Sequence, residues 1–458
     1  MDVSRRGFLG GATASAMAMA TGCATTGPAP IAKVRFASIG AWRMGQWTCD
    51  GLIKAGAQLV ALCDIDDEML EKAKQKWPGL PCYHDYRVML DEMGDAFDAV
   101  QIATPDSTHA YIAIDCMNAG KHVYVQKPLA RTFEECEMMR EAQRRTGVVV
   151  QMGNQGHPGC VRYDALNGAN VWGEVKEIES WSDRPVWPQG MTEYAKPEPL
   201  PKSISPESWD IWCGPAPDHG FSKAYHNFNW RGWWDYGCGA IGDMAVHNAD
   251  PAFWVFQLGL PVKVVGDTCG AGPVTVAFPK KSVIKMTFKN GIVFTWYDGG
   301  NKPAVRPNMK PGLQLGGNGI IIHGSKATTL GGSHASKPSV IAAGDHPWDK
   351  ESEKVAAAAQ EIINGADEEM YNHYREFVQA CKDANPQSCG SQLNYAAPLT
   401  EAFLIGCIGL RFPGKELHFD PETKRFTNCE EANRFLKAPN RGAWQFADIR
   451  EGRSWWSI

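Results

Sequence analysis

At 458 residues the chain is longer than a single compact core usually supports, which favours two domains. Its 44% apolar and 21% charged residues are ordinary for a globular protein. The formal net charge is -5 and no Lys/Arg cluster occurs, which argues against nucleic-acid binding because that function needs a basic face.

Residues 1–30 are expected to be a leader and linker rather than part of the fold. Ser4–Leu9 (SRRGFL) resembles a twin-arginine export signal, and the mildly apolar run Gly10–Gly22 is too short to span a membrane. Ala20–Cys23 resembles a lipoprotein cleavage box with Cys23 as the acylated residue. Simple cleavage near the same place, or a chance arginine pair in an unstructured N-terminus, are the alternatives. We therefore expect a periplasmic or exported protein.

Residues 31–156 alternate short apolar runs with amphipathic segments. Gly56, Gly120 and Gly147 stand where the intervening helices should end, and Thr132 with Glu135 forms a capping box for the last helix. Alternation of this kind predicts an α/β fold, a parallel sheet with helices on both faces. The expected strands are Val34–Ile39, Leu59–Cys63, Ala99–Ala103, His122–Val125 and Val148–Gln151.

The turn after the first strand carries part of a dinucleotide-binding motif. Gly40 and Gly45 match the first and third glycines of G-x-G-x-x-G, while Trp42 replaces the second. Arg43 and Met44 complete the turn. The sequence therefore predicts a Rossmann-type domain with a dinucleotide lying against this turn.

Asp64 follows the second strand and is the expected ribose ligand. It lies 64 − 45 = 19 residues beyond Gly45, where a carboxylate accepts hydrogen bonds from the adenosine ribose. With Asp66 beside it, Asp64 would repel a 2′-phosphate, which favours NAD over NADP. The alternative role for Asp64 is a helix N-cap.

Two further motifs connect the chain to a family. The turns Thr104–His109 (TPDSTH) and Gln126–Pro128 (QKP) resemble those of the glucose–fructose oxidoreductase, inositol dehydrogenase and rhizopine-catabolism (Gfo/Idh/MocA) family. There, a T-P-x-x-x-H turn borders the nicotinamide and an E-K-P turn supplies a lysine near the reacting carbon. Gln126 replaces the usual glutamate, so Lys127 is expected to lose a carboxylate neighbour. The implied cofactor contacts are Thr104, Pro105, His109, Gln126, Lys127 and Pro128. The alternative role for His109 is to cap its own turn.

The resemblance continues into the second half. Asp235–Asp250 is similar to the family's G-G-x-x-x-D-x-x-x-H-x-x-D helix, and Asp243 and His247, four residues apart, share one helix face. Ala396–Glu401 and Arg411–Gly414 resemble the closing helix and tail of bacterial members, so the likeness runs from about residue 34 to about residue 444.

Residues 157–458 are expected to form an α+β domain with a large, open, mainly antiparallel sheet. Asp298–Gly317 is Gly/Pro-rich and predicts a long loop, whereas Tyr371–Lys382 and Leu399–Arg411 predict helices. Related proteins pair through such a sheet, so the resemblance implies a homodimer or tetramer. The expected strands are Trp172–Ser182, Val262–Asp267, Ser282–Phe288, Ile292–Trp296 and Gly319–His323.

Hydride transfer from a hydroxyl-bearing carbon needs a base for the hydroxyl proton and a polar group for the oxygen. His247 is the expected base because the ordinary histidine pKa lies near the working pH. Lys127 is expected to polarise the oxygen, and Asp243 to orient His247 or bind a neighbouring hydroxyl. Residue types leave open which of Lys127 and His247 takes the proton.

Aromatic residues point to a carbohydrate substrate. Nine of the 17 tryptophans lie between Trp172 and Trp254, and flat rings offer platforms to sugar C–H faces. Most of them should only fill the core. The expected substrate contacts are Trp230, Trp233, Tyr225, Asn229, Asp243 and, from the opposite side of the cleft, His157.

We therefore expect an exported oxidoreductase that carries NAD tightly and acts on a sugar, cyclitol or sugar derivative. A redox-neutral NAD-dependent glycosidase or epimerase, and a non-catalytic sugar-binding protein, are the alternatives. No H-E-x-x-H, paired-cysteine or G-x-S-x-G pattern indicates a metal site or a serine hydrolase. The 14 cysteines resemble scattered buried thiols, with Cys381–Cys389 the one candidate bridge.

Overall fold

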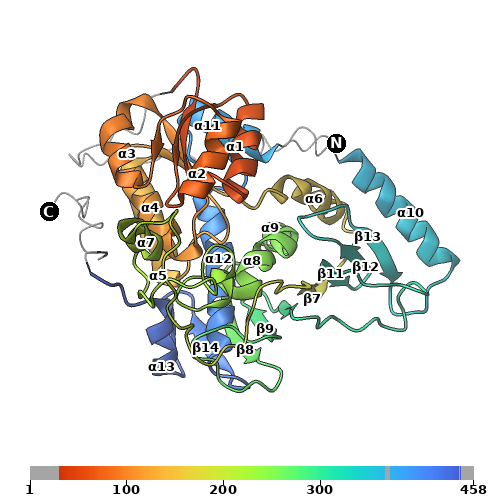
Figure 1. The fold of residues 1–458 in the computed structure, drawn as a ribbon. Coiled ribbons are helices and arrows are strands. Elements are labelled where there is room, and N and C mark those ends of the chain that lie inside the picture. Colours follow the sequence, from red (N-terminus) through yellow and green to blue (C-terminus); the bar gives the residue numbers. More distant parts are fainter. Residues whose placement is uncertain (1–29, 367–371, 443, 445–458) are drawn as a thin grey trace, which may run out of the picture.

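The computed structural model describes residues 30–366, 372–442 and 444. Two sheets organise this part of the chain, one in the helix-rich upper part of Figure 1 and one below and to its right. Within these residues no helix has the length and apolar character needed to cross a membrane. The twin-arginine and Cys23 predictions lie outside the described residues and stay predictions.

The first sheet is parallel and has six strands in the order β3-β2-β1-β4-β5-β6. Its strands are β1 (Arg35–Ile39), β2 (Gln58–Cys63), β3 (Cys82–Tyr83), β4 (Ala99–Ile102), β5 (His122–Val125) and β6 (Val150–Met152). Its helices are α1 (Met44–Lys54), α2 (Asp67–Lys76), α3 (Tyr86–Met93), α4 (Asp106–Asn118) and α5 (Phe133–Thr146). The predicted doubly wound α/β domain is confirmed, and only the two-residue β3 was missed.

Local sequence signals fix the ends of α5. Thr132 and Glu135 form the reciprocal capping box, with the Thr132 side chain accepting from the Glu135 N–H. Gly147 ends the helix in the left-handed conformation at φ +70°. Both predicted signals are confirmed.

The second sheet has nine strands in the order β13-β12-β11-β7-β10-β9-β8-β14-β15, and all pairs are antiparallel except β7 with β10. Its strands are β7 (Val175–Trp181), β8 (Pro261–Asp267), β9 (Val283–Phe288), β10 (Val293–Tyr297), β11 (Gly319–Gly324), β12 (Ala327–Gly331), β13 (Ser339–Ala343), β14 (Leu417–Asp420) and β15 (Arg425–Phe426). The predicted open, mainly antiparallel sheet is confirmed. Residues 298–318 form the predicted loop between β10 and β11.

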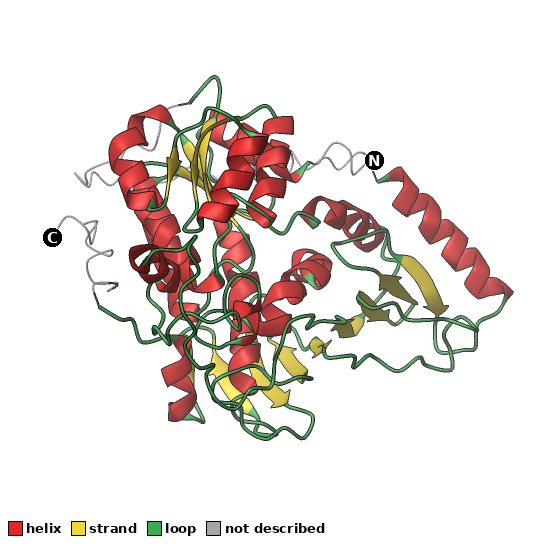
Figure 2. Ribbon diagram, in the orientation of Figure 1, coloured by secondary structure: helices red, strands yellow, loops and turns green. Residues whose placement is uncertain are grey.

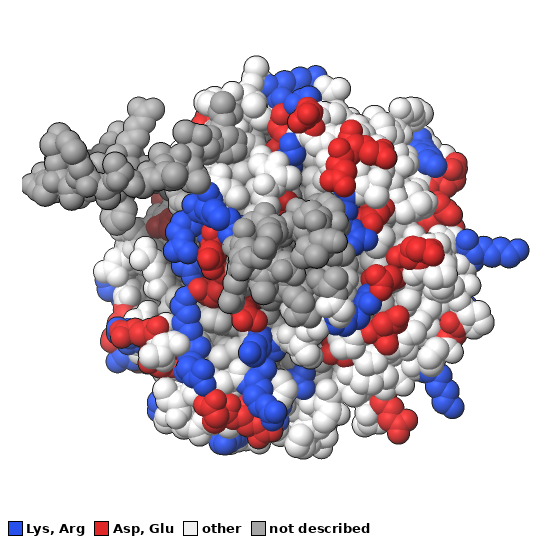
Figure 3. Space-filling view, turned by 90° about the vertical axis from the view of Figure 1, so that its left-hand side faces the viewer, with Lys and Arg blue, Asp and Glu red and all other residues white. Residues whose placement is uncertain are grey.

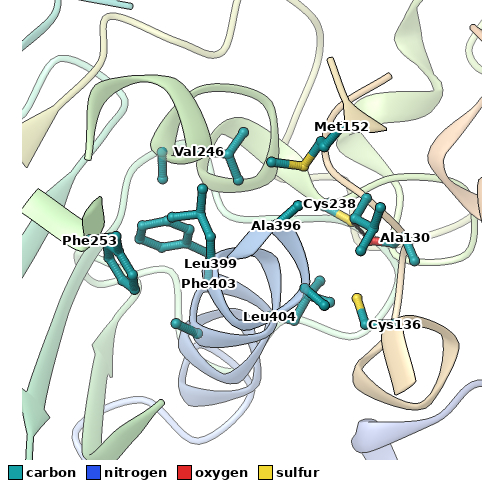
Figure 4. Packing of buried hydrophobic residues seen from close by; sticks show 14 of the residues in the cluster. Ala130, Cys136, Met152, Cys238, Val246, Phe253, Ala396, Leu399, Phe403 and Leu404 are labelled. Carbon is teal, nitrogen blue, oxygen red and sulfur yellow. Dashed lines mark hydrogen bonds between the residues drawn. The ribbon is translucent and has the colours of Figure 1, made fainter. Parts of the chain in front are cut away.

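The helices of the second half distribute over both sheets (Figure 2). They are α6 (Cys160–Gly168), α7 (Pro206–Cys213), α8 (Gly239–Asn248), α9 (Asp250–Phe256), α10 (Lys350–Gly365), α11 (His373–Lys382), α12 (Leu393–Gly409) and α13 (Glu430–Asn433). The apolar helix α12 runs through the centre and contacts α5, α8, β6 and β8. Figure 4 shows its Leu399 and Phe403 facing Val246 and Phe253. The same buried cluster includes Cys136 and Met152 of the first domain, so the two domains share one core.

Helix α11 completes the core of the first domain although it lies far along the chain. Phe377 and Cys381 pack in one cluster with Val34 of the first strand region, and the Ile31 N–H donates to the Lys382 carbonyl at 3.0 Å. A boundary at residue 156/157 therefore does not separate the two cores. Cys381 and Cys389 are both buried free thiols, so the candidate bridge is not formed.

A long connection, residues 182–238, leaves β7 and returns to α8. Most of its tryptophans build a separate aromatic core with Tyr225 and Tyr236.

On the face shown in Figure 3, basic and acidic side chains are interspersed rather than gathered by sign, in keeping with the small net charge.

Candidate active site

The turn between β1 and α1 requires its two glycines. Gly40 has φ +80°, and a Cβ there would lie 2.5 Å from the Ala103 carbonyl oxygen. A Cβ on Gly45 would lie 1.8 Å from the Gly40 carbonyl oxygen. No side chain fits at either position, so the backbone of the turn stays close to β4 and open to a ligand.

A cavity of about 470 Å³ lies at the carboxyl ends of β1, β2 and β4, directly against this turn. This is the edge at which doubly wound sheets bind dinucleotides. Ten of the cofactor contacts predicted from the sequence line this cavity: Gly40, Trp42, Arg43, Met44, Asp64, Thr104, Pro105, His109, Gln126 and Lys127. Gly45 and Pro128 lie behind that wall.

Trp42 does not block the crevice. Its half-buried indole lines the cavity wall, in the place of the motif's second glycine. Arg43 precedes α1 with φ 57°, so the turn bends through a left-handed residue that is not glycine. The space beside the turn is therefore retained despite the degenerate motif.

Asp64 is available to a ligand, and Asp66 takes the capping role. The Asp66 carboxylate accepts from the Glu68 N–H at the start of α2, at 2.9 Å. Asp64 lines the cavity and accepts from the Ala41 N–H at 2.9 Å, which ties β2 to the glycine turn. Burial raises the pKa of Asp64 to about 6, against these backbone hydrogen bonds. The Asp66 N–H donates to the other Asp64 carboxylate oxygen at 3.3 Å, and a ribose hydroxyl pair would add further donors to this carboxylate.

His109 joins the two family-type turns. Its ring nitrogens lie 2.9 Å from the Pro128 carbonyl oxygen and 3.0 Å from that of Thr104. Burial lowers the pKa of His109 to about 4, and a neutral ring donates to only one of these carbonyls. Its ring also borders the cavity, so the turn-fixing and cofactor-lining roles occur together.

Lys127 reaches across from the first domain to α8. Its ammonium donates to the Asp243 carboxylate at 2.6 Å and to the Asp243 carbonyl at 3.0 Å. Arg231 and Arg184 lie 3.4 Å and 3.9 Å from the same carboxylate. Burial alone would raise the pKa of Asp243, but attraction to Lys127 and Arg231 outweighs it and holds the pKa below its ordinary value.

Two of these residues have partners that the sequence did not indicate. The Gln126 amide donates to Thr48 at 2.8 Å, and Asp243 supplies Lys127 with a carboxylate that position 126 lacks. Asp243 orients Lys127 and not His247; its other expected role, binding a neighbouring substrate hydroxyl, stays a prediction. Residue type and spacing predicted that Asp243 and His247 share one helix face. They did not predict which residue each side chain contacts.

His247 is 3% exposed, and the Lys127 ammonium is close enough to influence its pKa electrostatically. Burial, followed by repulsion from His334 and Lys127, lowers the pKa of His247 well below 6.5, so the ring is neutral near pH 7. Its Nδ1 has no hydrogen-bond partner among the described residues. A neutral imidazole can accept a proton when a substrate hydroxyl comes within hydrogen-bond distance of its unprotonated nitrogen.

Sequence reasoning missed four residues of this site: Asp106, Arg184, Arg231 and His334. Asp106 accepts from the Cys238 N–H at 3.1 Å, and burial raises the pKa of its carboxyl to about 7, against attraction to Arg231 and Lys127. The Arg231 guanidinium lies 4.2 Å from the Trp230 ring centroid and lines the cavity beside it. The T-P-D turn was the one available signal for Asp106; nothing local marked the other three.

The predicted substrate contacts divide into two groups. Trp230 lines the cavity and Asp243 holds Lys127, as described above. Tyr225 and Trp233 are at most 2% exposed, inside the aromatic core of the connection, and Asn229 donates to the Lys223 carbonyl at 3.2 Å. None of these three lines the cavity, so they support the loop rather than contact a ligand there.

His157 is placed away from the cleft, contrary to expectation. It is 4% exposed, and its Nδ1 lies 3.0 Å from the Asp250 carboxylate. Asn154 at 2.8 Å and the Tyr395 hydroxyl donate to the same carboxylate. Among the described residues, His157, Cys160 and Asp250 could hold a metal ion by atom type and spacing, as could Glu177, Glu179 and His323.

The 182–238 connection closes the cavity from the side of the second domain. Trp212, His226 and Phe228 line it opposite the glycine turn. The connection is fastened to the first domain by the Asp67 N–H, which donates to the Ser203 carbonyl at 2.9 Å. Both domains thus contribute walls to one ligand space.

These residues fit a dinucleotide. The cradle against Gly40 and Gly45 excludes a Cβ, the Asp64 carboxylate faces the same space, and Lys127 stands at its other end. Nicotinamide chemistry would be supplied beside Lys127, whose ammonium the Asp243 carboxylate holds. His247 does not itself line the cavity.

Comparison with known proteins supports this assignment. Residues 34–154 match the family described as "Oxidoreductase family, NAD-binding Rossmann fold", and residues 173–312 match its "C-terminal alpha/beta domain", together more than half of the chain. The alpha-N-acetylgalactosaminidase of Shewanella oneidensis is 39% identical over 100 residues, 20% of this chain and 21% of that protein. The scyllo-inositol 2-dehydrogenase (NAD(+)) of Bacillus subtilis is 34% identical over 128 residues, 26% of this chain and 35% of that protein. The matches thus span a fifth to about a third of these relatives.

Solved structures agree on the fold. The WlbA dehydrogenase of Bordetella pertussis, in complex with NADH and UDP-GlcNAcA, superimposes with a TM-score of 0.57 at 20% identity, over 86% of this chain and 99% of that one. An inositol dehydrogenase homolog of Azotobacter vinelandii, complexed with NAD+, gives 0.58 at 16% identity with the same coverage. Family matches in both domains, the shared fold and the crevice agree: the chain belongs to the Gfo/Idh/MocA family of NAD-binding oxidoreductases.

Proposed function

We propose that the protein is an exported enzyme that oxidises a hydroxyl group of a sugar, cyclitol or sugar derivative with a tightly held NAD. One observation carries the proposal. The Lys127 ammonium, fixed by Asp243, lines a crevice shaped for a dinucleotide, and the neutral His247 imidazole, one helical turn beyond Asp243 on α8, lies within electrostatic range of it. Export, lipid attachment at Cys23 and homo-oligomer formation remain predictions from the sequence.

His247 is the group that takes the hydroxyl proton. Its imidazole is neutral, whereas the Lys127 ammonium is held by the Asp243 carboxylate and donates to it at 2.6 Å. Lys127 therefore serves to stabilise negative charge on the substrate oxygen. When bound, the nicotinamide would accept the hydride from the same carbon. The Asp64 carboxylate would hold the ribose and disfavour a 2′-phosphate, hence NAD rather than NADP.

The second candidate is a redox-neutral reaction in which NAD is reduced and reoxidised within one catalytic cycle, as in a glycosidase or epimerase. Trp212 and His226 close the cofactor crevice from the other domain, which favours retention of the cofactor between cycles. The 100-residue similarity to an alpha-N-acetylgalactosaminidase supports the same reaction class.

The first test is cofactor content and its reduction. The purified protein is denatured and the released nicotinamide quantified; about one equivalent of NAD is expected, and an empty protein that also fails to bind added NAD contradicts the proposal. The intact protein is then mixed with a panel of sugars, cyclitols and glycosides while nicotinamide absorbance is followed.

Lys127→Ala should reduce the rate of nicotinamide reduction by a factor of about 100 to 1,000, the effect of losing one oxyanion donor. Lys72→Ala is the matched control, because Lys72 is an exposed lysine of α2. Unchanged turnover in Lys127→Ala would remove Lys127 from the chemistry.

A further inference from the structure

The tip of the β12–β13 hairpin is brought to the active site from the far side of the second sheet. His334 and Ala335 at this tip adopt φ +58° and +50°, a left-handed pair without glycine. Gly156 and Gly159 accommodate it: a Cβ on Gly156 would lie 2.4 Å from the His334 carbonyl oxygen, and one on Gly159 2.3 Å from that of Ala335. The tip is thus seated against the turn that follows β6, in a conformation that usually accompanies function.

Hydrogen bonds set the orientation of the His334 ring. The Ser333 hydroxyl donates to the Asn248 side-chain oxygen at 2.8 Å, and Asn248 in turn donates to the Trp181 carbonyl at 2.8 Å. The Ser333 oxygen also lies at hydrogen-bond distance of the His334 Nδ1. With Nδ1 occupied, Nε2 is the nitrogen left for a ligand.

His334 stacks on His247. The ring centroids lie 4.0 Å apart at an interplanar angle of 25°. Unlike His247, His334 is exposed to solvent. Partial burial and the nearby Lys127 ammonium lower the pKa of His334, which keeps this second imidazole neutral near pH 7 as well.

Two parallel imidazoles at this spacing cannot hydrogen-bond each other, because their nitrogens lie in stacked planes. Their edges can instead address two neighbouring positions of one ligand. One ring is buried beside Lys127, and the other stands at the open side.

We propose that His334 is a second acid–base group of this site, which contacts the substrate and takes the proton from the carbon next to the one that is oxidised. The inference rests on the proposed function in its redox-neutral form, and it names the substrate class: a glycoside whose leaving group lies on the carbon beyond that proton.

The step balances as follows. Oxidation of the hydroxyl to a ketone sends the hydride to NAD and the hydroxyl proton to His247, and it makes the neighbouring C–H acidic. His334 accepts that proton, and the C–H electron pair forms a carbon–carbon double bond. The bond from the next carbon to the aglycone oxygen breaks, and the aglycone leaves with that electron pair. Water then adds: its hydroxyl bonds to the carbon that lost the aglycone, its proton neutralises the aglycone oxygen, and His334 returns its proton to the neighbouring carbon. Return of the hydride to the ketone carbon and of the His247 proton to the ketone oxygen restores the starting oxidation level and leaves both bases neutral.

The test compares His334→Gln with His346→Gln, an exposed histidine in the segment after β13. Each holoenzyme is mixed in D2O with a panel of nitrophenyl glycosides, and nicotinamide reduction, nitrophenol release and deuterium incorporation into recovered substrate are recorded. In His334→Gln, release and deuterium incorporation should fall about 100-fold or more, while reduction changes far less. His346→Gln should match the wild type.

Equal release and deuterium incorporation in His334→Gln and wild type would overturn the assignment. A wild-type protein that reduces NAD with a sugar but never releases an aglycone would also overturn it, while leaving the oxidoreductase proposal intact. A wild type that does neither removes both. If His334→Gln misfolds, the imidazole NMR signals of the wild type provide a second readout: a processed glycoside must shift the His334 resonance, and an unmoved resonance contradicts contact.

Discussion

Two buried histidines of this protein differ in what surrounds them. His157 and His247 are 4% and 3% exposed, and both lie near the junction of the two domains. His157 faces the Asp250 carboxylate, which Asn154 and Tyr395 also bind. His247 faces Lys127 and His334 and has an unpartnered Nδ1. The two histidines are therefore equally buried but have different neighbours: a carboxylate for His157, and basic side chains for His247.

The difference separates a structural histidine from a reactive one. The Asp250 carboxylate binds His157, Asn154 and Tyr395, and this polar network holds η3 (His157–Gly159), α9 and α12 together. Around His247 the neighbours are cationic or potentially cationic, and with burial they keep the ring neutral. An unsatisfied buried nitrogen costs stability, which a site that binds a hydroxyl can recover.

The largest expected effect is at His247. His247→Gln removes the base but keeps a polar side chain, so nicotinamide reduction by the best sugar should fall by a factor of about 100 to 10,000. The measurement is a single-turnover rate on holoenzyme with confirmed NAD content. His157→Gln is the companion variant, and its rate loss should not exceed its loss of folded protein. If the two variants lose activity alike, the contrast between the two histidines fails.

The sequence was sufficient for the first domain because its signals are local. Each strand, its following turn and the capping residues of the next helix are contiguous, as at Gly40–Gly45 and Thr132–Glu135. It also gave the second sheet's main strands from period-two and apolar runs. It missed β12–β15, which have two to five residues each and give only a weak periodic signal. Of these strands, β14 also depends on a partner far away in the chain, β8.

The site was predictable only where a motif spans it. Lys127, Asp243 and His247 came from the resemblance, but their partners are set by tertiary packing. His334 reaches His247 from a hairpin 87 positions later in sequence (334 − 247 = 87), and no local pattern marks it. His157 was misplaced for the same reason, since its role depends on Asp250, 93 residues away.

The next effect concerns the stability of the His157 network. Asp250→Asn removes the charge that three hydrogen-bond donors share. The amide N–H of the new side chain would face one of these donors, so that hydrogen bond is lost. The free energy of unfolding should fall by about 1.5–3 kcal/mol, the range for hydrogen bonds to a charged group. Denaturant midpoints measure it, with exposed Asp345→Asn as the control. An unchanged midpoint would mean that the carboxylate does not hold these elements together.

The smallest effect is the pH dependence of stability at His247. The folded protein keeps its pKa well below the unfolded value of about 6.5, so below that pH the unfolded chain binds a proton that the folded chain rejects. Stability should therefore be unaffected above pH 6.5 and fall as the pH drops below it, by at most about 1.4 kcal/mol per pH unit from this group.

His247→Gln removes that contribution, while buried His109 and His373, whose pKa values lie at about 4 and about 3, keep theirs. The variant's unfolding free energy should thus decline less steeply than the wild type's between pH 6.5 and about 5. If the unfolding free energies of variant and wild type run parallel with pH, His247 has the same pKa in the folded and unfolded states. Its imidazole would then be protonated as easily as in the unfolded chain, and the contrast with His157 would fail.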